Sequence, residues 1–506
     1  MKKLTTIWCT TALAMCALLL GSCADGYESP DGIDHDVRNA RMQTPSQDDI
    51  TFKVSTDGTY ATISWPTVSG AGGHEVTFKN VDDPENPVVI DGYDNYILDG
   101  STMTVSVEED SKYELTIRTL GNAELGNTDD PEPKTYAYST GVPSVATIPS
   151  GSDISTFWNA LELETGDTEV AIDLEAGGEY TLTELVDFSS HNITLRGDKV
   201  HRPMVKISGN GCFSTYSGLK FKFINFDMTD ATQESFLYMS NTDLPESIQA
   251  KNMPDKYVGS KVQGNVYIVE NPIYIAHCWF KNVPQSIIHD NKVVCAFWYF
   301  TLYDCIVQLH PRANTTRGFI SFEQAGRSIK NITIENSTIY NTNPDMSKST
   351  YFIRYQNSSN SQPHKVYGEL NAEYRSHTMK FMHSTMVNAY HPNTSKWFMN
   401  NVANNDFFIT VDHMVFYNCD YLYRLSQGSR TFRFNFWYND NSGQHRDVET
   451  KDSSNMPFAS EYDPQFTGDT MQELDFSLPN GGLNFTPQEY MIVSNEGGDP
   501  RWLPEK

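Results

Sequence analysis

Basic residues and long apolar segments are scarce in this sequence. The 506 residues include 37 Lys and Arg against 64 Asp and Glu, so the formal net charge is −27. Affinity for nucleic acid comes mainly from Lys and Arg that neutralise phosphates, which argues against a nucleic-acid partner. After residue 20, no stretch is apolar enough to span a bilayer, which takes about 20 residues.

Eight cysteines are present, but their spacing fits neither a disulfide framework nor a zinc site. Three lie in the first 23 residues, and the others are Cys212, Cys278, Cys295, Cys305 and Cys419. An odd number without a CxxC pair favours buried free thiols. Because no His residues have metal-ligand spacing either, we expect no metal and no cofactor.

Residues 1–22 have the pattern of a bacterial lipoprotein signal peptide. Lys2 and Lys3 precede an apolar run over residues 7–20 that is too short for a membrane span. The run ends in Leu-Gly-Ser before Cys23, which resembles the lipobox whose cysteine is acylated. The acidic residues after Cys23 resemble the surface-export signal of lipoproteins from glycan-foraging Gram-negative gut bacteria. The resemblance implies a lipid anchor in the outer membrane, facing the extracellular side.

After an acidic tether over residues 23–46, residues 47–148 read as a small β domain. Apolar and polar residues alternate in short runs, and Asp-, Gly- and Pro-rich turns separate the runs. Trp65 on one strand and Tyr113 on another resemble the core Trp and the corner Tyr of a fibronectin-type-III sandwich. That resemblance implies a spacer module without chemistry of its own.

A second region, residues 149–455, opens with a predicted helix over 152–163. Ser152 or Asp153 is placed to cap this helix. Four apolar residues recur at helical spacing, namely Ile154, Phe157, Trp158 and Leu161. Such a stripe is more often a packing face than a ligand platform. A single amphipathic helix before a long β region suits a cap over the open end of a stacked structure.

A degenerate repeat then runs through residues 223–440. Each copy begins with an apolar residue, in one copy replaced by Arg433, and has Asn, Asp or His two positions later, which we call the pivot. A second apolar residue and usually a second Asn or Asp follow the pivot. The pivots are spaced 22–52 residues apart, which indicates a stacked architecture. They are Asn225, His277, Asp304, Asn336, His383, His413 and Asn435.

A second apolar run follows most copies, at 235–239, 286–289, 318–322, 351–355, 396–399 and 421–425. Two strands joined at a polar corner, with a third strand leading into the next copy, make one coil of a right-handed parallel β-helix. Asn and Asp tolerate left-handed backbone, so a repeated polar corner builds a ladder. The unequal spacing places insertions at 241–270 and 342–377, of which the second is the expected functional loop.

The pattern therefore predicts an all-β protein. It consists of a fibronectin-type-III-like sandwich and a right-handed parallel β-helix with a capping helix, and residues 456–506 close the β-helix. This arrangement resembles the surface lipoproteins of glycan-utilisation systems that carry a pectate-lyase-like β-helix of unassigned function. Residues 498–502, Gly-Asp-Pro-Arg-Trp, resemble the terminal motif of that family. The resemblance implies a polysaccharide ligand, attachment to the outer membrane and a glycan transporter complex as partner.

No catalytic constellation is recognised in the β-helix region. Polygalacturonases of this fold need paired Asp residues on adjacent coils, but the Asp-Asp pairs here all precede residue 149. Residues 411–413, Val-Asp-His, resemble an element of some pectate lyases, yet the basic cluster of residues 310–312 with Arg317 precedes that element instead of following it. The histidines at the pivots are better interpreted as corner residues, and we assign no catalytic residue.

A strip across the second strands is the best candidate for glycan contact. Aligning those strands places Tyr238, His289, Arg354 and Arg424 in one column, flanked by Tyr355, Trp397 and Tyr423. Aromatic faces suit sugar rings, and guanidinium groups suit carboxylates. Packing on the coil surface is the competing interpretation, because a register slip of one residue turns each side chain inward.

The sequence favours a cell-surface lipoprotein that captures polysaccharide, acidic and pectin-like if the arginine column binds carboxylates. A polysaccharide lyase acting on a uronic-acid polymer and a surface adhesin remain the alternatives.

Overall fold

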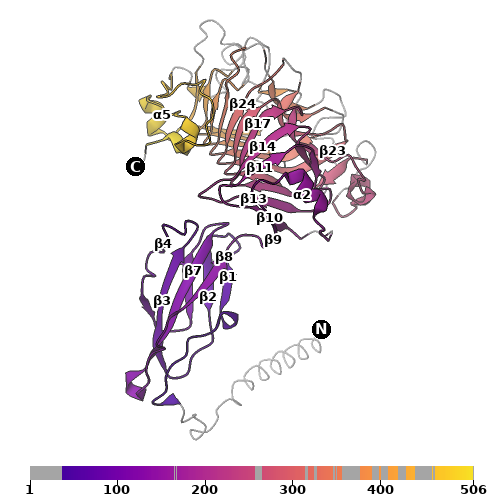
Figure 1. Cartoon of the computed structure of the whole chain (residues 1–506). Helices are drawn as coiled ribbons and strands as arrows, with labels where there is room; N and C mark the ends of the chain where they lie inside the picture. Colours follow the sequence, from indigo (N-terminus) through magenta and orange to yellow (C-terminus); the bar gives the residue numbers. More distant parts are fainter. Residues whose placement is uncertain are drawn as a thin grey trace, which may run out of the picture. The chain divides into compact units, whose positions relative to one another are not determined.

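The computed structural model describes two compact units, which divide between Gly141 and Val142 and are called unit 1 and unit 2 (Figure 1). The predicted signal peptide and Cys23 lie outside the described residues. No helix in the described part of the chain is long and apolar enough to cross a membrane. The described residues are 37–164, 166, 168–256, 265–313, 317–323, 328–345, 348, 350–355, 377–389, 398–400, 408–419, 429–438, 458–459 and 462–504.

Unit 1 is a sandwich of two antiparallel sheets. One has the order β1–β2–β6, and the other has the order β4–β3–β7–β8 with β5 beside β3. Trp65 and Tyr113 are buried in the core between them, and the Tyr113 hydroxyl accepts a hydrogen bond from the Glu108 amide at 2.7 Å. The elements are η3 (Gln47–Asp49), β1 (Thr51–Val54), β2 (Tyr60–Ser64), β3 (Ala71–Asn80), β4 (Val88–Val89), β5 (Tyr96–Leu98), β6 (Thr102–Ser106), β7 (Lys112–Gly121), η4 (Ala123–Leu125) and β8 (Lys134–Ser139).

Unit 2 is a parallel β-helix of three sheets, as the repeat predicts (Figure 1). Sheet I contains β9 (Ser144–Ile148), β10 (Val170–Leu174), β13 (Ile193–Arg196), β16 (Leu219–Lys222), β20 (Ile273–Ala276), β23 (Cys295–Tyr303), β26 (Ser328–Glu335), β29 (Thr378–Met382), β32 (Phe408–Asp412) and β34 (Ser429–Arg433), with β19 (Tyr267–Val269) beside β23.

Where all three strands of a coil are described, the chain passes from sheet II to sheet III and then to sheet I. Sheet II contains β11 (Glu179–Leu182), β14 (Met204–Gly209), β17 (Asn225–Ala231), β21 (Trp279–Val283), β24 (Ile306–Leu309), β27 (Thr338–Asn341), β30 (Thr385–Val387), β33 (Val415–Tyr417), β35 (Asn435–Tyr438) and β36 (Phe458–Ala459). Sheet III contains β12 (Leu185–Asp187), β15 (Cys212–Thr215), β18 (Ser235–Met239), β22 (Ser286–His289), β25 (Gly318–Phe322), β28 (Tyr351–Tyr355) and β31 (Met399–Asn400).

The boundary between the units lies earlier than the predicted one at 148/149. Strand β9, which lies within the range predicted for the sandwich, pairs in parallel with β10 and begins sheet I. An isolated alternating strand does not reveal its partner, because pairing depends on the neighbouring strand and not on the strand's own period.

Helix α2 (Ile154–Ala160) packs on the first coil. The Asp153 side chain caps it by accepting a hydrogen bond from the Thr156 amide at 2.9 Å. Trp158 meets the Phe188 ring edge-on, with centroids 4.7 Å apart. The apolar stripe is thus a packing face that covers the core at this end, in agreement with the interpretation of the sequence.

The core of unit 2 is one continuous stack of side chains from all three sheets. The five cysteines of the described residues are buried and free, as predicted. Burial raises the pKa of Cys212 and of Cys278 to about 12, so both are thiols at neutral pH and behave as small apolar residues.

The corner from sheet I to sheet II holds one residue in left-handed backbone in successive coils. The φ angles lie between 44° and 59° at Phe223, His277, Asp304, Asn336, His383, His413 and Phe434. Side chains at this corner stack, since the rings of His383 and His413 are 4.5 Å apart and nearly parallel. The corner role predicted for the three histidines is confirmed.

The predicted ladder is out of register at its two ends. Asn225 pairs with Trp279, and the residue that stacks on His277 is Phe223. Asn435 follows the left-handed residue Phe434, and its side chain instead accepts a hydrogen bond from the Met414 amide at 3.0 Å. Sequence alignment favours Asn at a corner, but stacking on a neighbouring ring also stabilises an aromatic residue there.

The Val-Asp-His element at 411–413 belongs to the same corner. His413 Nδ1 lies 2.7 Å from Asp412 Oδ1, and the second Asp412 oxygen accepts a hydrogen bond from Arg433. The Asp412 carboxylate therefore links two adjacent coils, which is a structural role.

Residues 462–504 cover the outer face of sheet II. Leu474, Phe485 and Trp502 pack there in one apolar cluster with side chains of sheet II such as Ile306 and Tyr340. The remaining helices in the described part of unit 2 are η5 (Glu246–Ile248), η6 (Ala250–Asn252), η10 (Pro479–Gly482), α5 (Tyr490–Ser494) and η11 (Pro500–Trp502).

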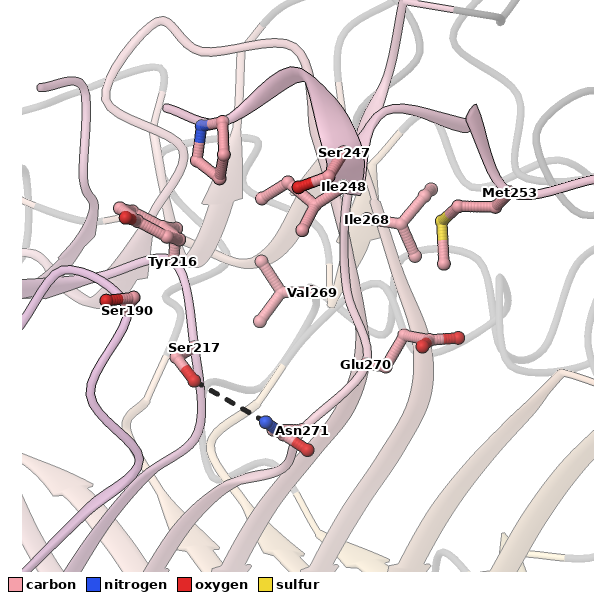
Figure 2. A pocket seen from close by; sticks show the side chains of 11 residues that line it. Ser190, Tyr216, Ser217, Ser247, Ile248, Met253, Ile268, Val269, Glu270 and Asn271 are labelled. Carbon is pink, nitrogen blue, oxygen red and sulfur yellow. Dashed lines mark hydrogen bonds between the residues drawn. The ribbon is translucent and has the colours of Figure 1, made fainter. Parts of the chain in front are cut away.

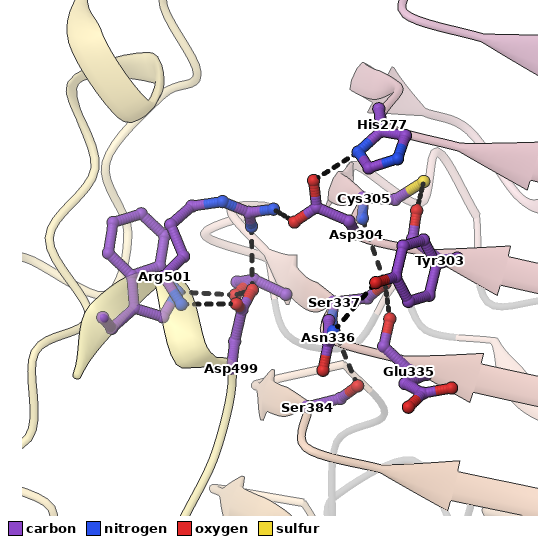
Figure 3. A network of polar contacts seen from close by, with 12 residues as sticks. His277, Tyr303, Asp304, Cys305, Glu335, Asn336, Ser337, Ser384, Asp499 and Arg501 are labelled. Atoms are coloured by element: carbon purple, nitrogen blue, oxygen red, sulfur yellow. Dashed lines mark hydrogen bonds and ion pairs between the residues drawn. The ribbon is translucent and has the colours of Figure 1, made fainter. Parts of the chain in front are cut away.

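A partly buried polar network attaches the predicted terminal motif to the ladder (Figure 3). Arg501 forms ion pairs with Asp304, at the corner, and with Asp499, the latter at 2.8 Å. Asp304 in turn lies 2.6 Å from His277 Nδ1. Asp499 is 1% exposed and accepts a hydrogen bond from the Thr338 hydroxyl at 2.7 Å. The network joins the C-terminal segment to two neighbouring coils.

Gly498 allows the chain to reach this network. Its φ of 95° is strained for other residues, and a Cβ there would lie 2.7 Å from the Thr385 hydroxyl. The Gly498 amide donates to the His413 carbonyl at 2.7 Å, so the backbone contacts the corner directly.

We expect Asp499 to make unit 2 less stable as the pH rises from about 4 to about 6. Burial raises the pKa of Asp499 to about 6, against the lowering effect of Arg501. The folded state then binds this proton more tightly than the unfolded state. The stabilisation is complete below the unfolded pKa and is lost as the pH rises through the folded pKa.

Asp499→Asn tests this expectation, because it preserves the shape and removes the titration. The unfolding free energy of the unsubstituted chain, relative to the variant, should fall by about 2 kcal/mol over that pH range. Urea unfolding at several pH values measures the difference. Equal pH dependence in the two proteins would contradict it.

Candidate functional site

The outer face of sheet III brings together part of the predicted strip. Tyr238 pairs with His289, His289 with Ser321, and Ser321 with Arg354. The residues that precede them, such as Leu237 and Ile353, belong to the core. Because side chains alternate along a strand, the column itself lies on the outer face. The alignment of Tyr238, His289 and Arg354 is confirmed, and Ser321 completes it.

Tyr355 does not belong to this face. Its side chain is 0% exposed and lies in the core, where its hydroxyl accepts a hydrogen bond from the Ile329 amide at 3.3 Å. Arg354 on the outer face places the next residue inside, so the predicted contact of Tyr355 with a glycan is wrong. Trp397, Tyr423 and Arg424 lie outside the described residues.

An arginine and two carboxylates lie at the ends of strand β25. Arg317 precedes the strand and forms an ion pair at 2.8 Å with Glu323, which follows it. Arg317 also pairs with Glu234 from the previous-but-one coil. Ser321, between Arg317 and Glu323 in sequence, is small and fully buried. A larger outward side chain at that position would compete for the space that the ion pair occupies.

His289 lies beside this ion pair. It is 3% exposed, and its Nδ1 accepts a hydrogen bond from the Asn291 amide at 2.9 Å. A neutral ring with this contact carries its proton on Nε2, which lies 3.8 Å from the Glu323 carboxylate. The interaction with His289, together with Arg317, lowers the pKa of Glu323 to about 2. Glu323 is therefore ionised at neutral pH.

Tyr238 completes the aromatic part of the site. Its ring meets His289 edge-on, with centroids 5.5 Å apart. Its hydroxyl lies 3.5 Å from the Gln233 side-chain oxygen. Burial raises the pKa of Tyr238, so the hydroxyl keeps its proton and acts as a hydrogen-bond donor and acceptor.

Arg354 differs from Arg317 in its partners. Its guanidinium stacks near the Tyr351 ring, 5.5 Å from the centroid. Its Nε is buried without a hydrogen-bond partner, and no ion pair joins Arg354 to any residue that the structure describes. The neighbouring Gly318 accommodates it, because a Cβ on Gly318 would lie 3.1 Å from the Arg354 Cβ. A planar cation in this state is suited to a carboxylate ligand.

The Arg317–Glu323 pair is a feature that the sequence does not predict. In the sequence, Arg317 belongs to a basic cluster with residues 310–312, but the Arg312 guanidinium donates to the backbone carbonyls of Met228, Thr229 and Ala231 and is structural. The only sequence signal for the pair was the presence of opposite charges at the two ends of one strand. Among the described residues, no group of three or more His, Cys, Asp or Glu has the geometry to hold a metal ion.

Two family models match the sequence, and both are described as domains of unknown function. DUF4992 matches residues 4–210, and DUF4957 matches residues 178–342. The first match thus includes unit 1 and the first coils, and the second lies within unit 2. No curated protein matches the chain significantly.

Two solved structures show similarity over much of the chain. Pectate lyase PelI from Erwinia chrysanthemi, in complex with tetragalacturonic acid, is 10% identical with a TM-score of 0.17, and the match covers 72% of this chain and 85% of that one. A family 28 exopolygalacturonase from Yersinia enterocolitica is 8% identical with a TM-score of 0.20, over 79% and 97% of the two chains. At these values neither similarity informs function.

We expect Glu323 to stabilise unit 2 above the ordinary glutamate pKa of 4.5 and to lose this effect as the pH falls toward about 2. A carboxyl with a lowered folded pKa stabilises the folded state only while it is ionised. Glu323→Gln removes the charge with little change in shape. The stability difference between the unsubstituted chain and the variant, measured by urea unfolding, should shrink on acidification. A difference that stays constant or grows would show that the ion pair does not stabilise the fold.

Proposed function

We propose that the outer face of sheet III binds an extended acidic polysaccharide. The observation that carries the proposal is Arg354, a half-buried guanidinium whose Nε has no hydrogen-bond partner, on the same column as Tyr238 and His289. The chain carries a large excess of negative charge. An arginine without a carboxylate partner among the described residues is unusual in such a protein, and a ligand carboxylate would supply that partner.

The geometry of the column supports a polymer over a single sugar. Neighbouring strands lie about 4.7–4.9 Å apart, which is too close for one sugar residue per coil. A chain along the column therefore contacts several coils with each sugar. Tyr238 offers an aromatic edge and a hydroxyl, and Arg354 offers a planar pair of donors three strands further along.

The described residues support capture more than cleavage. A uronate lyase needs a base that can take the proton at C5. In the column, Tyr238 keeps its proton, because burial raises its pKa. His289 is almost fully buried, and its Nδ1 is occupied by the Asn291 amide. Neither side chain offers a free basic atom that could take this proton. Cleavage is therefore the alternative that the experiment below must exclude.

The proposed cellular setting is the outer surface of a Gram-negative cell. In this proposal Cys23 carries the lipid anchor, unit 1 acts as a fibronectin-type-III-like spacer, and unit 2 captures the glycan for an outer-membrane import complex. The Leu-Gly-Ser-Cys sequence and the acidic residues after it support the anchor. The compact core of unit 1, closed around Trp65 and Tyr113, supports a spacer role.

We expect Arg354→Ala to weaken binding to uronic-acid polymers by about 1.5–3 kcal/mol, the range for a hydrogen bond to a charged group. The chain without residues 1–23 is run in affinity gels that contain polygalacturonate, alginate or a neutral polysaccharide. Arg430→Ala is the matched control, because it removes the same charge from an exposed position on strand β34 of sheet I.

The same gels separate the alternatives. Retardation that Arg354→Ala reduces and Arg430→Ala does not supports capture at sheet III. Appearance of an unsaturated product, measured by its ultraviolet absorbance, supports a lyase. If the unsubstituted chain is not retarded by any acidic polymer and forms no product, an adhesin becomes the better hypothesis.

We expect Cys23→Ala to abolish acylation and to release the protein from the outer membrane, because the thiol is the acceptor of the lipid. Fractionation of cells with labelled fatty acid measures both effects. Cys9→Ala is the matched control, since it removes a cysteine from the predicted signal peptide without touching the acceptor. Continued membrane attachment and labelling of Cys23→Ala would contradict the anchor.

A further inference from the structure

A cavity of about 590 Å³ lies between the 241–270 insertion and the corners of the coils from sheet III to sheet I (Figure 2). One side is formed by corner residues of successive coils, including Ser190, Tyr216 and Asn271. The other side is formed by η5, the segment that follows η6, and β19. Its size is in the range of about 300–1,000 Å³ that is typical of small-molecule sites.

The described parts of the insertion that form one wall, residues 241–256 and 265–270, pack on unit 2. They have their own small core, in which Ala250 and Ile268 pack with Trp298 of strand β23. The ammonium groups of Lys256 and Lys330 lie 5.5 and 4.9 Å from the Trp298 ring centroid. Strand β19 also pairs with β23. The cavity is therefore preformed, which lowers the entropic cost of binding a ligand.

The lining combines an apolar patch with hydrogen-bonding groups. Ile248, Met253, Ile268 and Val269 supply the apolar patch. Figure 2 shows Val269 between the Tyr216 ring on one side and Ile268 on the other, with Ser217 and Asn271 below. The Asn271 amide donates to the Ser217 hydroxyl at 3.4 Å, which fixes the polar edge.

Three hydroxyl groups of the lining have unused hydrogen-bonding capacity. In the described structure, the side chains of Ser190, Tyr216 and Ser247 make no hydrogen bond, although their neighbours do. Glu270 adds a carboxylate, and Lys256 holds it in place at 2.6 Å. A ligand in the cavity thus meets one apolar face and several donors and acceptors around it.

We propose that this cavity binds one neutral sugar ring. A pyranose or furanose ring has an apolar face of C–H groups and a rim of hydroxyls, which matches a lining of aliphatic and aromatic carbon edged by Ser, Tyr, Asn and Glu. No Lys or Arg occurs among the described lining residues, and Lys256 already balances the charge of Glu270, so the lining offers no unpaired cation to an anionic sugar. The ligand class therefore differs from that of the sheet III face.

This inference goes beyond the proposed function and does not depend on it. Sheet III offers a half-buried cation, whereas the cavity offers hydroxyls in a concave site. Its occupant is either a free monosaccharide or a neutral residue at the end or on a branch of a polysaccharide. These two sources share the same chemistry at the cavity.

The probe is a panel of methyl glycosides of neutral hexoses and pentoses, titrated into the chain without residues 1–23 by calorimetry. Tyr216→Ala should weaken the best ligand about threefold to tenfold, the effect of losing one aromatic contact. Ser247→Trp should abolish measurable binding by filling the cavity from its exposed rim, and an exposed position limits the risk to folding. Tyr299→Ala, which removes a tyrosine that is 41% exposed on β23, is the matched control and should bind normally.

The outcomes separate this site from sheet III. Arg354→Ala should leave neutral-sugar affinity unchanged, and Ser247→Trp should leave retardation by acidic polymer unchanged. Oligosaccharides that bind at least as tightly as the monosaccharide identify a polymer end or branch, and weaker binding identifies the free sugar. The proposal is overturned if no glycoside binds, or if Tyr216→Ala and Ser247→Trp, with unchanged unfolding transitions, both bind like the control.

Discussion

The parallel pairing of each coil with the next is the constraint on which unit 2 depends. A strand within a sheet forms its hydrogen bonds with the strands of the coils before and after it. Paired residues of successive coils therefore lie on the same face of the sheet, either inside or outside. The series Tyr238, His289, Ser321 and Arg354 is one consequence. Equivalent positions stand too close for unscreened like charges, and the charged residues of this face are accordingly separated or paired.

The charges around strand β25 show how this constraint is met. Arg317 is held by Glu234 and Glu323, which come from different positions along the coil. Arg354 follows Ser321 in its column, so no cation lies directly before it. The charge of Arg317 is thus neutralised within the protein, whereas Arg354 has no carboxylate partner among the described residues. This difference between two nearby arginines is the physical basis for assigning ligand binding to Arg354.

The sequence predicts the features that repeat and fails at those that depend on a single connection. The strands of sheet III, the capping helix and the buried thiols follow from local period and composition. The misplacement of Tyr355 comes from widening the strip by one residue, which reverses the face in a strand. The ladder ends at Phe223 and Phe434 are aromatic, and a search for Asn there selects the wrong residue. The cavity beside Tyr216 requires contacts between an insertion and three corners, which no local pattern encodes.

A stack in fixed register produces flat faces, and concave sites must come from the segments that interrupt it. A polymer can therefore bind to sheet III only by lying across successive coils, and each sugar then spans more than one coil. The 241–270 insertion breaks the repeat between β18 and β20 and brings Ile248 and Met253 opposite the corner residue Tyr216. That arrangement can enclose a ring, which the flat face cannot. The same fold thus permits two kinds of recognition, one by a charged column and one by a preformed cavity, and the irregular spacing of the repeat is what makes the second possible.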